Sequence, residues 1–266
     1  MSVGAGEQDP TVIALPGRDR RQIVSFGGGG FSMEAGNPLL DEYVLRITGK
    51  ERPRVCFLPT ASGDADHYIV RFYRAFAANR CEPTHLSLFR REQGTGDIRE
   101  LLLSQDLIYV GGGSVLSMLG AWRAHGLDLI LRDCWQQGVV LCGLSAGSLC
   151  WFAEGVTSFH GAPRRYRGLG LLPFSNCVHY GDEVGRRESY HQLLRGGMCP
   201  GYAAADGAAL HFAGRRLIAA VSSRPKAKAW CVGDAGTDVA ETELPVRFLG
   251  EPEPNGESTP PLTAVA

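Results

Sequence analysis

The chain has 266 residues, of which 44% are hydrophobic, and a formal net charge of −1 at pH 7. A chain of this length and composition can bury one large core. The balanced charge, without a basic run, argues against nucleic acid or an anionic membrane as a partner. No apolar run reaches membrane-spanning length, and the N-terminus lacks the pattern of a secretory signal peptide.

Strand and helix signals alternate along most of the chain. Residues 1–20 are polar and are expected to form a flexible arm, residues 250–266 a disordered Pro-rich tail, and residues 21–249 a single domain. Strands are expected at residues 22–26, 54–58, 84–88, 107–110 and 139–142. Helices are expected at residues 37–49, 64–79, 114–125 and 127–137. This order predicts an α/β fold with a mainly parallel sheet and helices on both faces.

The pattern changes beyond Tyr202. Strand signals follow one another at residues 208–212, 216–221 and 227–232, and Gly214 lies between the first two. Consecutive strands with short connections are typical of antiparallel hairpins. The sequence therefore predicts a C-terminal β-meander.

A sharp turn is indicated after the apolar strand at residues 139–142. Residues 143–147, Gly-Leu-Ser-Ala-Gly, fit the G-x-S-x-G nucleophile elbow, in which the serine lies between a strand and a helix. The start of that helix directs backbone N–H groups at the reaction site. A serine that only caps a helix after a glycine-rich turn fits the same five residues. The motif alone leaves both interpretations open.

Glycine clusters end two of the expected strands, at residues 27–30 and 111–113. Sites in open α/β sheets lie beyond the carboxyl ends of the strands, where Ser145 is also expected. Backbone N–H groups of such loops can approach an oxyanion or a phosphate closely. Both clusters lack the third glycine of the dinucleotide motif G-x-G-x-x-G, and no P-loop is present. The glycines therefore favour an oxyanion site, and we expect no cofactor.

A serine nucleophile needs a base, and the chain has seven histidines. His179 ends a strand-like run downstream of the elbow and is the best-placed base, although a structural role remains open on the residues alone. His160 and His211 are less clear. The others lie in helical or strand contexts typical of surface or capping positions: His67, His85, His125 and His191.

The eight cysteines do not suggest a metal site or disulfides. Four of them, Cys56, Cys142, Cys177 and Cys231, lie in apolar, strand-like segments, and no C-x-x-C pair occurs. Buried thiols of this kind stay reduced in the cytoplasm. We therefore expect a cytoplasmic protein without a metal.

Several of these segments together resemble the peptidase E family of serine peptidases. The resemblance covers about residues 22 to 232 and includes the family's separation between Gly113 and Ser145. That family also contains cyanophycinases, and its fold is similar to class I glutamine amidotransferases. The segments that carry the resemblance are residues 109–113, 143–147, 171–173 with 178–180, and 201–208.

The resemblance implies an intracellular, metal-free exopeptidase that releases an N-terminal aspartate from small peptides. It makes Ser145 the nucleophile, His179 the base, and the N–H groups of Gly113 and Ala146 the oxyanion hole. It also assigns two substrate contacts. Gly112 is one, and Arg187 is the other, pairing with the side-chain carboxylate of the substrate, a task that suits a planar guanidinium.

The sequence departs from the family at the third catalytic residue. Many members carry an acid near residues 157–159, where this chain has Ser158. Asp206 corresponds to a family acid before a glycine and is our choice for the group that orients the base. The alternatives are Glu154, Asp182 and Glu183.

Two rival functions remain from the sequence. One is acyl transfer on a different substrate, such as a cyanophycin-like β-linked peptide or an amide. The other is a non-catalytic binding protein on the same scaffold. The expected partner is a small peptide, without nucleic acid or membrane, and a homodimer is the candidate assembly.

Overall fold

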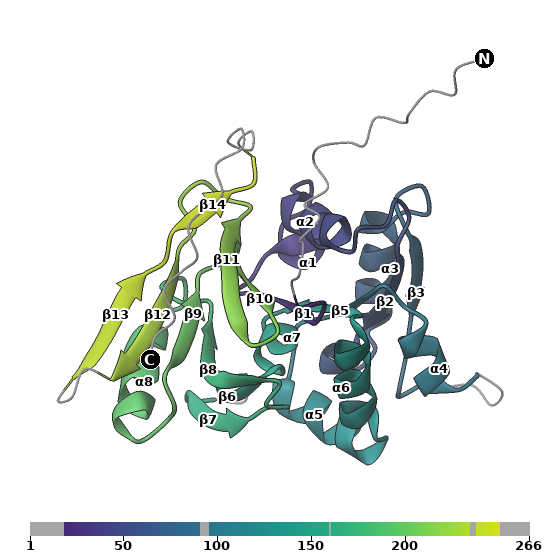
Figure 1. The fold of residues 1–266 in the computed structure, drawn as a ribbon. Helices are drawn as coiled ribbons and strands as arrows, with labels where there is room; N and C mark the ends of the chain where they lie inside the picture. Colours follow the sequence, from purple (N-terminus) through teal and green to yellow (C-terminus); the bar gives the residue numbers. More distant parts are fainter. Residues whose placement is uncertain (1–18, 91–95, 160, 235–237, 251–266) are drawn as a thin grey trace.

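The computed structural model describes residues 19–90, 96–159, 161–234 and 238–250. Nearly all of the arm and tail expected at residues 1–20 and 250–266 lies outside these ranges. Figure 1 shows two sheets side by side, with helices packed mainly around one of them.

The larger sheet confirms the expected parallel core. Its strand order is β14-β11-β10-β1-β5-β4-β2-β3, and the run from β1 to β3 is parallel throughout. The parallel strands are β1 (Gln22–Phe26), β5 (Val140–Leu144), β4 (Leu107–Val110), β2 (Arg54–Leu58) and β3 (Glu82–His85). The remaining strands are β10 (Ala208–Ala213), β11 (Arg216–Ser222) and β14 (Val246–Phe248).

Helices cover both faces of this sheet because alternate strand residues point to opposite sides. Ile108 and Val110 pack with α4 (Ile98–Leu103), α5 (Val115–Ala124) and α6 (Leu127–Gln137). Tyr109 and Val140 face the opposite core. On that side lie α1 (Gly30–Met33), α2 (Leu39–Ile47) and α3 (Asp66–Ala75). A short turn, η1 (Thr60–Ser62), follows β2.

A second sheet has the order β13-β12-β9-β8-β6-β7, and the sequence indicated only part of it. The β10–β11 pair is an antiparallel hairpin, as expected, but β12 leaves it and pairs with β9 instead. The free edge of β11 is taken by β14, so β12 has no place there. The strands are β6 (Phe152–Thr157), β7 (Arg164–Arg167), β8 (Leu172–Val178), β9 (Gly201–Ala204), β12 (Ala229–Asp234) and β13 (Val239–Glu243), with α8 (Arg186–Arg195) packed beside them.

Within the described ranges, no helix combines the length and apolar composition that crossing a bilayer requires.

One carboxyl group is buried between α2 and the larger sheet. Asp41 is 2% exposed and accepts a hydrogen bond from the Tyr109 hydroxyl at 3.2 Å. Burial raises the pKa of Asp41 to about 7, because an ionised carboxylate is poorly solvated there. The folded protein therefore holds a proton on Asp41 at pH values where the unfolded chain has released it.

This proton predicts a pH-dependent effect of Asp41→Asn on stability. The native pKa lies above the unfolded value, so the stability that Asp41 contributes is present below about pH 4 and is lost as the pH rises through 7. The neutral amide escapes that loss. In denaturant unfolding we expect the variant to match the wild type at about pH 4 and to exceed it by roughly 2–4 kcal/mol at about pH 8. A difference that does not change with pH would contradict this assignment.

Candidate active site

The elbow between β5 and α7 (Ala146–Leu149) holds Ser145 in an unusual backbone conformation. Ser145 has φ +51° and ψ −114°, a region that side chains with a Cβ rarely adopt. The turn is tight on both sides. A Cβ on Gly143 would lie 2.6 Å from the Gly147 carbonyl oxygen, and one on Gly147 would overlap the Val110 carbonyl oxygen. The two glycines thus let the elbow pack against the end of β4.

The strained serine predicts an order of stability among variants. Ser145→Gly removes the Cβ that disfavours this conformation, whereas Ser145→Ala keeps it. We expect the glycine variant to be more stable than the alanine variant by about 1–2 kcal/mol, measured by urea unfolding. Glycine ordinarily costs stability relative to alanine, so an alanine variant of equal or higher stability would show that Ser145 is unstrained.

Three side chains from different loops meet at this elbow. His179, which follows β8, places Nε2 at 3.0 Å from Ser145 Oγ and Nδ1 at 2.6 Å from Asp206 Oδ1. A carboxylate can only accept, so Nδ1 carries the hydrogen and Nε2 accepts from the Ser145 hydroxyl. The side chains of His179 and Asp206 are 14% and 17% exposed, which leaves this hydrogen-bonded row close to solvent.

The backbone fixes the His179–Asp206 pair. His179 has φ +54°, and its N–H donates to the Gly27 carbonyl at 3.1 Å. The Asp206 N–H donates to Asp182 Oδ2 at 2.7 Å. Gly28 lies behind both side chains: its Cβ would overlap Asp206 Oδ1 and lie 3.1 Å from His179 Cε1. The sequence predicted an oxyanion role for the cluster that contains Gly28, whereas in the structure Gly28 contributes by lacking a side chain behind the His179–Asp206 pair.

The four candidate acids have different partners. Asp206 contacts His179, while Asp182 accepts from the Asp206 backbone. Glu183 pairs with Arg186, and Glu154 accepts from Arg165 and from the Cys199 N–H. The structure thus brings Asp206 to the imidazole and gives the other three carboxylates other contacts.

Two backbone N–H groups have no hydrogen-bond partner in the described part of the chain: that of Ala146, which follows Ser145, and that of Gly113, which follows Gly112. Gly113 has φ +137°, and a Cβ there would overlap the Ala61 carbonyl oxygen. The Gly112 N–H, by contrast, donates to the Tyr68 hydroxyl at 3.0 Å. A Cβ on Gly112 would lie 3.6 Å from Ser145 Cβ, so Gly112 adjoins the serine, but its N–H is already bonded to Tyr68, a contact that the sequence did not indicate.

Arg187 lies on α8 with its guanidinium bound to Glu241 of β13 by two hydrogen bonds. It also lies over the Tyr180 ring, 5.7 Å from the ring centroid. Glu241 accepts further bonds from Tyr180 and His191. Glu241 thus occupies two nitrogens of this guanidinium, Nε and Nη2, and the Arg187 side chain is 52% exposed.

The other candidate bases lie elsewhere. His211 is buried on β10 and bonds to Tyr43 and Gln22. His160 lies outside the described residues. Among the described histidines, His179 is therefore the one that contacts Ser145.

Comparisons with known proteins place this site in context. The family model for peptidase family S51 matches residues 23–220. The uncharacterised peptidase YgaJ of Bacillus subtilis strain 168 is 50% identical over 231 residues, which cover 86% of this chain and 100% of YgaJ.

Two crystal structures share the fold at low identity. A peptidase from an acI-B1 Actinobacterium has a TM-score of 0.64 at 18% identity, over 86% of this chain and 95% of the other. A protein assigned as a peptidase E from Listeria monocytogenes EGD-e has a TM-score of 0.56 at 17% identity, over 74% and 96%.

Proposed function

We propose that Ser145, His179 and Asp206 carry out the reaction of this protein on small peptides. The chain belongs to peptidase family S51 and is therefore a serine-type peptidase. The observation that carries this proposal is the row of hydrogen bonds from Ser145 Oγ through His179 to Asp206. Such a row, on a strained strand-to-helix turn, is the arrangement that activates a serine.

The reaction follows from this geometry. His179 Nε2 takes the hydroxyl proton as Ser145 Oγ attacks the scissile carbonyl carbon. Asp206 keeps the hydrogen of the imidazole on Nδ1 and stabilises the imidazolium that forms. The unpaired N–H groups of Gly113 and Ala146 stabilise the oxyanion of the tetrahedral intermediate. His179 then gives its proton to the leaving amine, and water resolves the acyl-enzyme by the same steps.

The proposed substrates are short peptides with an N-terminal aspartate, cleaved by an exopeptidase in the cytoplasm. The family resemblance supports this choice, and Arg187 supplies a cation close in sequence to His179. All eight cysteines are free, in keeping with a reducing compartment. Hydrolysis of dipeptides that differ only at the N-terminal residue by the purified protein tests the proposal, and Asp-X peptides should be cleaved fastest.

A second substrate class is favoured by one observation, the occupation of Arg187 by Glu241. With that guanidinium engaged, the same catalytic groups would serve an uncharged amide or a cyanophycin-like β-linked peptide. Faster cleavage of neutral substrates than of Asp-X dipeptides would select this alternative.

Arg187→Ala tests whether Arg187 recognises the N-terminal aspartate of the substrate. Truncating an arginine that pairs with a desolvated carboxylate costs about 2–5 kcal/mol. We therefore expect kcat/KM to fall by about 30-fold or more for Asp-X dipeptides and to change little for Ala-X or Leu-X. Arg195→Ala is the matched control, because Arg195 lies exposed on the same helix and pairs with Asp238. Equal losses on acidic and neutral peptides would show that Arg187 only holds Glu241 in place.

A further inference from the structure

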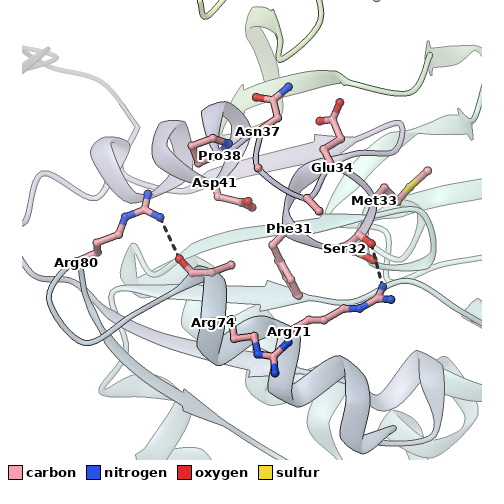
Figure 2. Close-up of a pocket in the computed structure, with 13 residues that line it drawn as sticks. Phe31, Ser32, Met33, Glu34, Asn37, Pro38, Asp41, Arg71, Arg74 and Arg80 are labelled. Atoms are coloured by element: carbon pink, nitrogen blue, oxygen red, sulfur yellow. Dashed lines mark hydrogen bonds between the residues drawn. The ribbon is translucent and has the colours of Figure 1, made fainter.

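A pocket of about 690 Å³ opens beside the loop that supports the catalytic groups. Figure 2 shows it between α1 with the following loop, α2, and α3. Phe31 and Asp41, which are 8% and 2% exposed, are its most buried lining residues. Its volume lies in the range of roughly 300–1,000 Å³ that small-molecule sites occupy.

Two arginines on α3 give the pocket a positive wall. Arg71 and Arg74 are three residues apart, so they are neighbours on the same side of the helix. Both are exposed. Arg71 makes a long contact, 3.4 Å, from Nη1 to the Ser32 carbonyl, and Arg74 has no partner among the described residues. Neither guanidinium is paired with a carboxylate in the described part of the chain.

The other titratable side chains that line the pocket already have hydrogen-bond partners. Glu34 accepts from the Ser223 hydroxyl at 2.6 Å and from Arg224 Nε at 2.5 Å. Asp41 accepts from Tyr109, and Arg80 contacts Glu42 and the Ala75 carbonyl. Arg71 and Arg74 therefore keep their charge available for an anion, and planar guanidinium groups suit the two oxygens of a carboxylate.

The pocket wall is continuous with the site. Met33 and Glu34 belong to the segment that begins at Gly28, which packs behind His179 and Asp206. The Gly29 N–H contacts Met33 Sδ at 3.3 Å.

A second connection runs through Arg224, which pairs with Glu34 and packs against Gly207, the residue after Asp206. A ligand in the pocket would thus touch the same segment that supports the catalytic pair.

We propose that this pocket binds the α-carboxylate of a short peptide or a free amino acid through Arg71 and Arg74. The inference rests on the proposed function, since these molecules are the substrates and products of a peptidase that acts on small peptides. The carboxylate has two sources: the C-terminal residue of the bound substrate, or a released amino acid.

Binding to the inactive Ser145→Ala protein tests the proposal without turnover. The probes are L-aspartyl-L-alanine, its C-terminal amide, and L-alanine, titrated by calorimetry. We expect Arg71→Gln/Arg74→Gln to weaken binding of the free dipeptide at least about tenfold, as loss of a charge-assisted contact requires. Binding of the amide, which lacks the carboxylate, should be equal in both proteins. Arg46→Gln, a charge change on the exposed side of α2 away from the pocket lining, should leave all affinities unchanged.

Competition separates the two sources. L-alanine that displaces the dipeptide identifies one subsite for the C-terminal residue, and L-alanine that binds beside it identifies a product site. Three results would overturn the proposal. The double variant could bind the dipeptide and L-alanine as tightly as the parent protein does, it could lose as much affinity for the amide as for the dipeptide, or neither carboxylate probe could bind at all. The single Arg74→Gln variant, compared at matched thermal stability, excludes misfolding as the cause of a loss. The binding measurement needs no hydrolysis, so it can be interpreted even if the catalytic assignment is wrong.

Discussion

Ser145→Ala is expected to lower peptide hydrolysis by on the order of 10⁴-fold or more while the protein stays folded. The hydroxyl is the only group lost, and its partner is His179 Nε2 at 3.0 Å. The oxyanion donors remain in this variant, so its residual rate reflects substrate binding and electrostatic stabilisation without a nucleophile. Steady-state kinetics on the best dipeptide of the panel, with circular dichroism of both proteins, measures the effect.

Ser148→Ala is the matched control for this loss. Ser148 lies on α7 three residues after Ser145, and its hydroxyl accepts from Asn176 Nδ2 at 3.0 Å rather than contacting His179. Its removal should cost about 1 kcal/mol of stability and change kcat little. Near wild-type hydrolysis by Ser145→Ala would remove the serine mechanism for this site.

Asp206→Asn is expected to reduce kcat by roughly 10³–10⁴-fold, somewhat less than Ser145→Ala. The side-chain amide of this variant can donate to Nδ1 of His179, which moves the hydrogen of the imidazole to Nε2. The Nε2 atom then can no longer accept the Ser145 proton. His179→Ala should be nearly as inactive as Ser145→Ala, because the losses of residues that act as one unit do not add.

Asp182→Asn separates this effect from a general loss of charge. Asp182 contacts the Asp206 backbone rather than the imidazole, so its amide should retain activity within about tenfold. A harmless Asp206→Asn beside an inactive Asp182→Asn or Glu154→Gln would assign the orienting carboxylate to another residue.

Local sequence patterns predicted the elements on which the nucleophile sits. The apolar run at residues 139–142 and the glycines around Ser145 specify a buried strand and a tight turn by themselves, because both depend on neighbouring residues. The alternating strands and helices likewise predicted a mainly parallel sheet, and the strands from β1 to β3 are parallel.

The acid could not be selected in this way, because its position depends on strand pairing. Val178 lies opposite Ala204 in the pairing of β8 with β9, which brings the residues just beyond them, His179 and Asp206, side by side. No local pattern fixes that register. The contact between Arg187 and Glu241 joins residues 54 positions apart through a strand that the sequence did not indicate.

The strand β7 of the second sheet was missed for a related reason. The strand β7 buries only Tyr166, and its other three residues are exposed arginines. It therefore lacks the alternation of apolar and polar residues that would identify a strand in the sequence. Its stability comes from pairing with β6, which is a tertiary effect.

Covalent labelling tests whether Ser145 is a nucleophile that His179 activates. The purified protein would be treated with a fluorophosphonate, digested and mapped by mass spectrometry. We expect one adduct, on the peptide that contains Ser145, and we expect it to form slowly or not at all in His179→Ala. Full-rate hydrolysis by protein labelled at Ser145, or inactivation through an adduct on another residue, would show that Ser145 is not the nucleophile.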